Sequence, residues 1–131
     1  MAIKNYLLDT NTVIYYLQGQ FSSSANKFMD GVFKHHAPSI SIITEIELLC
    51  WETNSKEDMH ILNQFIKDAQ VFELDNNIKI KTITIRRAYK IKLPDAIIAA
   101  TALVHDLTLL TRNEKDFSKI SNVEITNPWN K

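Results

Sequence analysis

Four short segments of this chain each place a carboxylate beside a small polar residue. Three of them begin or follow an apolar run, so their acids should lie at the rim of a hydrophobic core, where acids are uncommon unless something pairs with them. Carboxylates brought together also repel one another and raise their own pKa values. A hard divalent cation with oxygen ligands removes that penalty. The sequence therefore points to a Mg²⁺ or Mn²⁺ site assembled from residues 7–11, 41–48, 93–100 and 111–117.

The acids that these segments offer are Asp9, Asp95, Asp116 and one of the pair Glu45 and Glu47. Each aspartate also has an ordinary structural explanation, because Asp9 can cap a helix, Asp95 can stabilise a first helical turn through the helix dipole, and Asp116 can be a loop acid. The two glutamates would lie about 200° apart around a helix that turns roughly 100° per residue, so only one can face a metal. Periodicity does not choose between them. The prediction of a site rests on the joint placement of the acids.

Composition places the chain among ordinary globular proteins. Its 131 residues suit one domain with one core, and hydrophobic residues make up 45% against 23% charged. No apolar run approaches the roughly 18 residues of a membrane span, and a charge follows the N-terminus too soon for a signal peptide. Cys50 is the only cysteine, which excludes an internal disulfide and a cysteine-based zinc site. We therefore expect a cytoplasmic protein with no membrane contact.

Other catalytic chemistries find no support in the sequence. No serine lies in a Gly-x-Ser-x-Gly elbow, and Cys50 falls in an apolar helix face, so covalent nucleophilic catalysis is not indicated. The histidines share no metal-ligand spacing and are expected to be structural or solvated. They are His35, His36, His60 and His105. The two tryptophans, Trp51 and Trp129, are expected in the core or at an interface.

The net charge is zero, from 15 basic and 15 acidic residues, whereas a general nucleic-acid binder is usually basic. The distribution of charge says more, because residues 76–94 hold six cations and no acid and lead directly to Asp95. These cations are Lys79, Lys81, Arg86, Arg87, Lys90 and Lys92. Two interpretations stay open: a solvated helix face, or a track for a phosphate backbone.

Apolar runs of strand length alternate along the chain with segments of helical periodicity. Strands are expected at residues 6–8, 38–42, 71–74, 108–110 and 123–125. Helices are expected at residues 10–18, 22–34, 44–52, 55–68, 76–89 and, after Pro94 in a first turn, 96–104. This alternation predicts a parallel sheet covered by helices on both faces, with ligands beyond the carboxyl ends of the strands. The acids can all meet at that edge, with Glu47 and Asp95 in early helical turns.

Three of these helices carry more specific expectations. The helix at 44–52 should bury the face formed by Ile42, Ile43, Ile46, Leu49 and Cys50. The segment 76–89 begins with strand-like alternation, but its length without Gly or Pro favours a helix. The segment 96–104 is apolar nearly all round, which predicts a buried helix.

With these segments in view, the chain resembles PIN-domain nucleases, and among them the VapC-like toxins of bacterial toxin–antitoxin pairs. Residues 7–14, Leu-Leu-Asp-Thr-Asn-Thr-Val-Ile, look like the family's opening strand and first acid. Residues 41–49 look like its Ser-x-x-Thr-x-x-Glu-Leu segment, which selects Glu47 over Glu45. Residues 93–102 are the most specific match and carry Asp95.

The last motif of the family resembles residues 109–117, Leu-Leu-Thr-Arg-Asn-Glu-Lys-Asp-Phe. Some relatives place an acid where this chain has Asn113, so the resemblance implies Asp116 as the fourth acid. A Gly often follows the Glu-Leu segment in the family, whereas Cys50 and Trp51 stand there in this chain, which bears on packing more than on chemistry.

The resemblance implies a three-layer α/β/α fold over one domain, residues 1–131, and Mg²⁺- or Mn²⁺-dependent RNA cleavage. The metal and catalytic residues would be Asp9, Glu47, Asp95 and Asp116. Supporting polar groups would be Asn11, Thr111 and Asn113, and RNA contacts would come from Arg112 and the six cations of residues 76–94. An antitoxin partner and a homodimer are also implied.

Two alternatives compete with this interpretation. A Mg²⁺-binding phosphoryl-receiver domain also gathers acids at strand ends, and Asp75 could be its phospho-acceptor, but no adjacent acid pair follows Leu8. The other alternative is a degenerate PIN scaffold that binds RNA without cutting it. Acids at all four motif positions argue against that second alternative.

Overall fold

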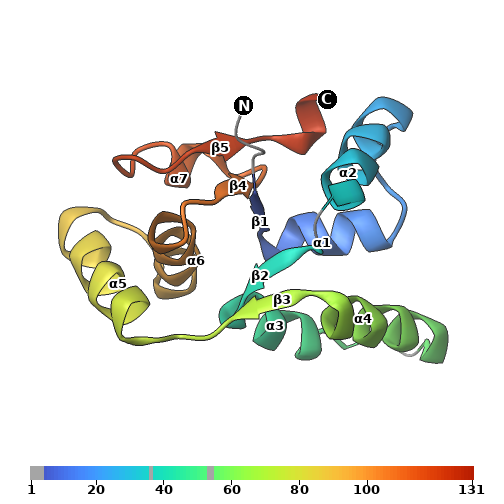
Figure 1. Cartoon of the computed structure of the whole chain (residues 1–131), viewed down its shortest axis with the longest axis horizontal. Helices are drawn as coiled ribbons and strands as arrows, with labels where there is room; N and C mark the ends of the chain where they lie inside the picture. Colours follow the sequence, from blue (N-terminus) through green and yellow to red (C-terminus); the bar gives the residue numbers. More distant parts are fainter. Residues whose placement is uncertain (1–4, 36, 53–54) are drawn as a thin grey trace.

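A computed structural model describes residues 5–35, 37–52 and 55–131 of the chain. Its strands form one parallel sheet in the order β3-β2-β1-β4-β5 (Figure 1). The strands are β1 (Tyr6–Leu8), β2 (Ser39–Ser41), β3 (Gln70–Phe72), β4 (Thr108–Leu110) and β5 (Ile125–Thr126). The predicted α/β fold with a central parallel sheet is therefore confirmed.

Helices connect the strands, as a parallel sheet requires. They are α1 (Thr10–Leu17), α2 (Ser23–His35), α3 (Ile42–Leu49), α4 (Lys56–Asp68), α5 (Asn76–Ala88), α6 (Leu93–Val104) and α7 (Glu114–Phe117). A 3₁₀ turn, η1 (Pro128–Asn130), follows β5. None of the helices in the described part of the chain combines the length and apolarity needed to cross a membrane.

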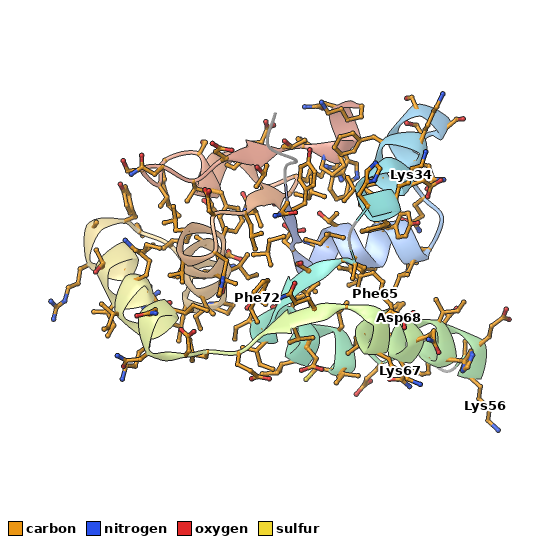
Figure 2. All side chains as sticks on the ribbon, in the orientation of Figure 1. Lys34, Lys56, Phe65, Lys67, Asp68 and Phe72 are labelled. Carbon is orange, nitrogen blue, oxygen red and sulfur yellow. The ribbon has the colours of Figure 1, made fainter. Side chains whose placement is uncertain are left out.

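Two hydrophobic cores lie on opposite faces of the sheet, because successive strand side chains point to opposite sides. Leu7 and Leu109 pack with α5 and α6 in one core. Leu8 and Leu110 pack with α1, α2, α3 and α4 in the other. Figure 1 shows α5 and α6 on one side of the sheet and α1 and α2 on the other. Charged side chains such as Lys56 project outward from α4 (Figure 2).

The expected elements are present, with shifted ends. Residues 76–89 form a helix as predicted, since Asp75 caps α5 by accepting the Ile78 N–H at 2.9 Å. Helix α6 is buried along most of its length. Strand β5, at Ile125–Thr126, begins two residues later than predicted. Strand β3 begins at Gln70, one residue earlier than predicted. Helix α7 and the turn η1 were not predicted, because four and three residues are too short for a periodic signal.

The predicted buried face of α3 is wrong. Ser41 ends β2 and caps α3, so the helix begins at Ile42 and ends at Leu49 rather than spanning 44–52. Thr44 and Leu48 are fully buried, whereas Ile46 and Leu49 are about half exposed, at 50% and 49%. Cys50 is exposed as well. Helix α3 packs against α1 and α6. Its buried side carries Thr44 and Leu48, and the side with Ile46 and Leu49 is exposed.

Candidate active site

Asp9 stands directly after β1 and is fixed there by its neighbours. Its backbone N–H donates to the Leu110 carbonyl at 3.2 Å, which ties the end of β1 to β4. Oδ1 accepts the Thr12 backbone N–H at 2.9 Å, so Asp9 caps α1. Oδ2 accepts the Thr111 hydroxyl. The side chain is held at the carboxyl edge of the sheet and is only 8% exposed.

The Thr12 hydroxyl completes this arrangement. It lies 2.6 Å from Asp9 Oδ1 and 2.9 Å from the Leu110 carbonyl, so its single proton serves one acceptor at a time. Burial raises the pKa of Asp9 above its ordinary 3.8; the hydrogen bonds from Thr111 and Thr12 oppose this, and the charge of Glu47 adds to it. A carboxylate offers about four acceptor sites, so Asp9 keeps capacity for a cation.

Glu47 reaches the same edge from α3. Its Oε1 accepts the Thr10 hydroxyl at 2.6 Å, and the Thr44 hydroxyl lies 3.3 Å from that Thr10 oxygen. This pair links α3 to the first residue of α1, beside Asp9. Glu47 lies in the second half of α3 rather than in its first turn, because the helix starts at Ile42. The charge of Glu47, and not that of Glu45, contributes to the raised pKa of both Asp9 and Asp95.

Asp95 and Asp116 complete the cluster. Asp95 lies in the first turn of α6, where burial raises its pKa most, followed by the charges of Asp116, Glu47 and Asp9, while Lys92 lowers it. The other three predicted acids therefore all contribute to the raised pKa of Asp95. Asp116 is held by Asn113, whose amide Nδ2 donates to Oδ2 at 3.1 Å and whose Oδ1 accepts the Asp116 N–H at 3.3 Å.

The four carboxylates are suitable ligands for a hard cation, although they do not surround a common point. Among the described residues, no three His, Cys, Asp or Glu side chains are gathered closely enough to hold a metal ion as they lie. The acids are nevertheless all carboxylates, the ligands that Mg²⁺ uses, and their mutual repulsion raises the pKa of Asp95. Glu47 is exposed, and its Oε2 makes no hydrogen bond among the described residues. A divalent cation would relieve the repulsion and draw these carboxylates together.

Half of the predicted cationic track lies next to the acids. A shallow cavity of about 430 Å³ is lined by Arg86, Lys90, Ile91, Lys92, Asp116 and Lys119. Two of its cations are fixed, since Arg86 donates to the Ile91 carbonyl and Lys119 donates to the Lys90 carbonyl, each at 2.6 Å. The other predicted RNA contacts on α5 do not line this cavity and are exposed along the helix. They are Lys79, Lys81 and Arg87.

A larger cavity, of about 550 Å³, borders Asp9 itself. Three of the site residues predicted from the sequence line it: Asn11, Arg112 and Asn113. It also contains Ile14, Tyr15 and Trp129. Thr111 does not line it, because the hydroxyl of Thr111 is buried against Asp9.

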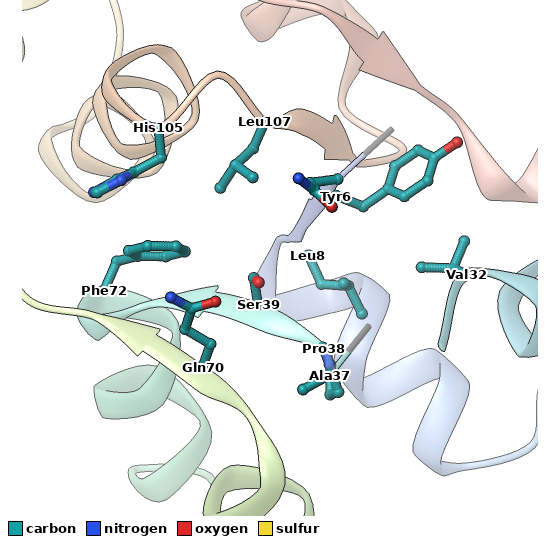
Figure 3. Close-up of a pocket in the computed structure, with 11 residues that line it drawn as sticks. Tyr6, Leu8, Val32, Ala37, Pro38, Ser39, Gln70, Phe72, His105 and Leu107 are labelled. Carbon is teal, nitrogen blue, oxygen red and sulfur yellow. The ribbon is translucent and has the colours of Figure 1, made fainter. Parts of the chain in front are cut away.

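A third cavity, of about 340 Å³, lies at the opposite edge of the sheet, near the residues that begin the strands (Figure 3). Gln70 and Ser39 begin β3 and β2, and Leu107 precedes β4. None of the described residues that line this cavity carries a carboxylate. His105 stacks on Phe72 there, with ring centroids 4.1 Å apart, which agrees with its expected structural role. His36 lies outside the described residues.

Residues 6–123 match the PIN domain family, which covers most of the chain. The chain belongs to the PIN-domain family. Ribonuclease VapC2 from Rickettsia felis is 26% identical over 134 residues, which cover 96% of this chain and 98% of that protein. The expected resemblance to VapC-like proteins is thereby confirmed.

Solved structures agree with this assignment. A toxin–antitoxin complex from Klebsiella pneumoniae contains a chain that is 29% identical, with a TM-score of 0.71 over 94% of this chain and 97% of that one. VapBC2 from Rickettsia felis, bound to a DNA fragment from its promoter, gives a TM-score of 0.79 at 22% identity, over 93% of this chain and 97% of that one. At that identity the second likeness concerns the fold alone.

Several residues of this PIN-domain site were missed from the sequence. The threonines that hold the acids, Thr10, Thr12 and Thr44, stood inside the quoted motifs but were given no role. Asp9 could be expected as the cap of the helix that carries Thr10 and Thr12, since Asp is a preferred N-cap residue. Lys119 and the aromatic residues of the larger cavity had no such signal, because they reach the site from distant parts of the chain.

Proposed function

We propose that this PIN-domain protein is an endoribonuclease that depends on Mg²⁺ or Mn²⁺. The main support is that carboxylates from three other segments lie near enough to Asp95 to raise its pKa, in addition to the larger effect of burial. Acids whose pKa values are shifted by burial and by neighbouring charges are typical of functional sites. The distant similarity to ribonuclease VapC2 from Rickettsia felis points to RNA as the substrate.

Asp9, Asp95 and Glu47 would hold the cation, and Asp116 would orient the ligands around it. When bound, the cation would activate water for attack on the phosphodiester and neutralise charge on the phosphate. The chain's own groups prepare this arrangement. Thr111 and Thr12 fix the orientation of Asp9 by hydrogen bonds. The RNA backbone would follow the cations beside Asp116 (Arg86, Lys90, Lys92 and Lys119).

The same proposal includes partners. The similar chain from Klebsiella pneumoniae was solved in a toxin–antitoxin complex, which supports a cognate antitoxin for this chain. Such a partner could place an Arg or Lys among the four acids, where a charge-assisted contact would displace the cation. A homodimer would set two sites along one groove. RNA cleavage of this kind would take place in the cytoplasm.

The phosphoryl-receiver alternative gains nothing from the geometry. Asp75, which would have to accept the phosphoryl group, instead caps α5 through a hydrogen bond from the Ile78 N–H. The chain's membership of the PIN-domain family also speaks for nuclease chemistry.

The chemistry of the cut ends tests the nuclease proposal. Purified protein is incubated with end-labelled RNA in Mg²⁺ and in EDTA, with Asp95→Asn as the matched variant. We expect products with a 5′-phosphate and a 3′-hydroxyl in Mg²⁺, and no cleavage in EDTA or by folded Asp95→Asn. Cyclic 2′,3′-phosphate ends formed in EDTA would mean that the RNA's own 2′-hydroxyl attacks, which would remove the four acids from the mechanism.

A further inference from the structure

The larger cavity beside Asp9 has the walls of a nucleobase site. We propose that it binds one unpaired base of the RNA next to the phosphate that is cut, so that the protein selects single-stranded RNA. This inference rests on the proposed nuclease function. The cavity of about 550 Å³ is within the range of small-molecule sites, roughly 300–1,000 Å³. Asp9 is part of its wall, which places an occupant directly beside the acids.

Helix α1 supplies one wall of the cavity. Asn11, Ile14 and Tyr15 stand at helical spacing, so they present one face, which lines the cavity. Ile14 and Tyr15 offer an apolar surface to a flat ring. Asn11 is exposed, and its amide offers both a donor and an acceptor to the edge of a base. A face of this composition suits a heterocycle better than a bare phosphate.

Trp129 supplies a second part of the wall as a rigid platform. Its ring is fixed by Tyr15 and Phe21, with centroid separations of 5.0 and 4.8 Å. Arg112 lies over the ring, with its guanidinium carbon 5.5 Å from the centroid. Single-stranded nucleic acids are bound by stacking bases on aromatic rings and on arginine planes. The Arg112–Trp129 pair therefore offers a stacking surface that is in place before RNA arrives.

Among the described residues, two polar groups of this wall lack a hydrogen-bond or ion-pair partner. The Trp129 indole Nε1 is buried and has no hydrogen-bond partner among the residues the structure describes. Arg112 forms no ion pair within the same residues, although Asp9 lines the same cavity. A buried donor without a partner is costly, and an exposed guanidinium can reach the phosphate that carries the base. The Arg112 guanidinium is better satisfied with a nucleotide in place.

The cationic cavity near Asp116 accounts for the rest of the strand. This cavity borders Asp116, whereas the larger cavity with Trp129 (the aromatic cavity) borders Asp9. The cationic cavity is lined mainly by Arg86, Lys90, Lys92 and Lys119. The acids thus separate a stacking surface from a phosphate-binding surface. A strand that crosses them would put a base on one side and its backbone on the other. A base held in a duplex cannot leave its partner to enter the cavity without losing its pairing.

The experiment uses the full chain carrying Asp95→Asn, which keeps the RNA uncut, and Trp51→Phe, which leaves Trp129 as the only tryptophan. The probes are a single-stranded RNA hexamer, an abasic ribose-phosphate hexamer of equal charge, and a duplex. We expect the RNA hexamer to change Trp129 emission saturably and to bind about 5- to 150-fold more tightly than the abasic hexamer. Equal affinities with unchanged emission would overturn the base site.

Two substitutions sharpen the result, each read by the anisotropy of labelled hexamers. Arg112→Gln should shrink the preference for RNA over the abasic hexamer, whereas Lys115→Gln, which removes an exposed cation outside the cavity, should leave that ratio unchanged. Trp129→Phe keeps an aromatic wall, so it should retain part of the preference if the protein folds. The same loss from both cation variants would mean that charge alone is being measured, and would also overturn the base site.

Cleavage by the unmodified protein separates the two proposals. Base-dependent binding without any cleavage would discard the nuclease and retain the base site. Cleavage that is indifferent to an abasic nucleotide at every position of the substrate would retain the nuclease and discard the base site.

Discussion

Hydroxyl groups hold the acids of this site in position before any cation binds. Thr111 and Thr12 donate to the two oxygens of Asp9, and Thr10 donates to Glu47. Groups outside the metal ligands commonly set ligand orientation in this way, and their loss typically costs about 10- to 100-fold in affinity or activity. The threonines therefore convert a repulsive set of carboxylates into an ordered one.

The two glutamates of α3 should differ sharply in their effect on cleavage. Glu47→Gln keeps an oxygen that can accept the Thr10 hydroxyl but loses the charge, so we expect about a 10- to 100-fold loss of activity. Glu45→Gln should change activity by less than about threefold, because Glu45 is not among the charges that raise the pKa of Asp9 or Asp95. Both are measured as kcat/KM on one RNA. The reverse ranking would show that the wrong glutamate has been assigned.

Asp95 should destabilise the metal-free protein in a pH-dependent way. Its pKa is raised above 3.8 by burial and by three neighbouring acids, so the folded state holds the proton more tightly than the unfolded state. Little cost exists below the ordinary pKa, and the cost grows as the pH rises through the raised one. Asp95→Asn should therefore raise the Tm in EDTA at neutral pH, and the gain should shrink on acidification. In Mg²⁺ the wild type should be stabilised more than the variant. A Tm difference that is independent of pH would contradict this.

Asp9 and Asp95 could be proposed from the sequence because each stands beside an apolar run, whereas the family resemblance selected Glu47 and Asp116. Asp9 follows the run that becomes β1, and Asp95 opens the apolar segment that becomes α6. The aromatic cavity could not be found in that way. Tyr15, Phe21, Arg112 and Trp129 meet only in the folded chain, and no local spacing joins them.

Helix α3 shows where patterning fails for a whole element. Periodicity identified a helix, but both of its sides are apolar, so the pattern could not indicate which side meets the core. The fold settles this through Thr44 and Leu48, which face α1 and the sheet. The buried threonine is accepted because its hydroxyl lies beside that of Thr10. The more apolar side, with Ile46 and Leu49, stays exposed.

Adjacent leucines on α3 provide a direct measure of this assignment. Leu48 is fully buried, so Leu48→Ala should lower the free energy of unfolding by about 2–5 kcal/mol. Leu49 is 49% exposed, so Leu49→Ala should lower it by less than about 1 kcal/mol. Urea unfolding of dilute metal-free protein gives both values. Equal losses would mean that the helix is rotated from the orientation described.

The arrangement of the whole molecule follows from the alternation of strands and helices. Each β1 and β4 residue faces one of two cores, and the parallel strands bring their carboxyl ends to one edge. That edge gathers acids from β1, α3, α6 and α7, although the chain has no net charge. The zero net charge therefore conceals an acidic centre with cations beside it. The net charge alone gives no sign of this arrangement, whereas the positions of the cations along the sequence do.

Exposed apolar side chains on α3 and α5 should form the contact between two copies of the chain. Ile46 on α3 and Ile83 on α5 are 50% and 47% exposed, and covering both would remove apolar surface from water. We expect a dimer by light scattering, and a folded monomer after Ile46→Lys with Ile83→Lys, since buried unpaired charges oppose association. Ile61→Lys is the matched control, because Ile61 is 39% exposed on the separate helix α4. A wild-type monomer, or a double variant that remains dimeric, would discard this interface and leave the nuclease proposal standing.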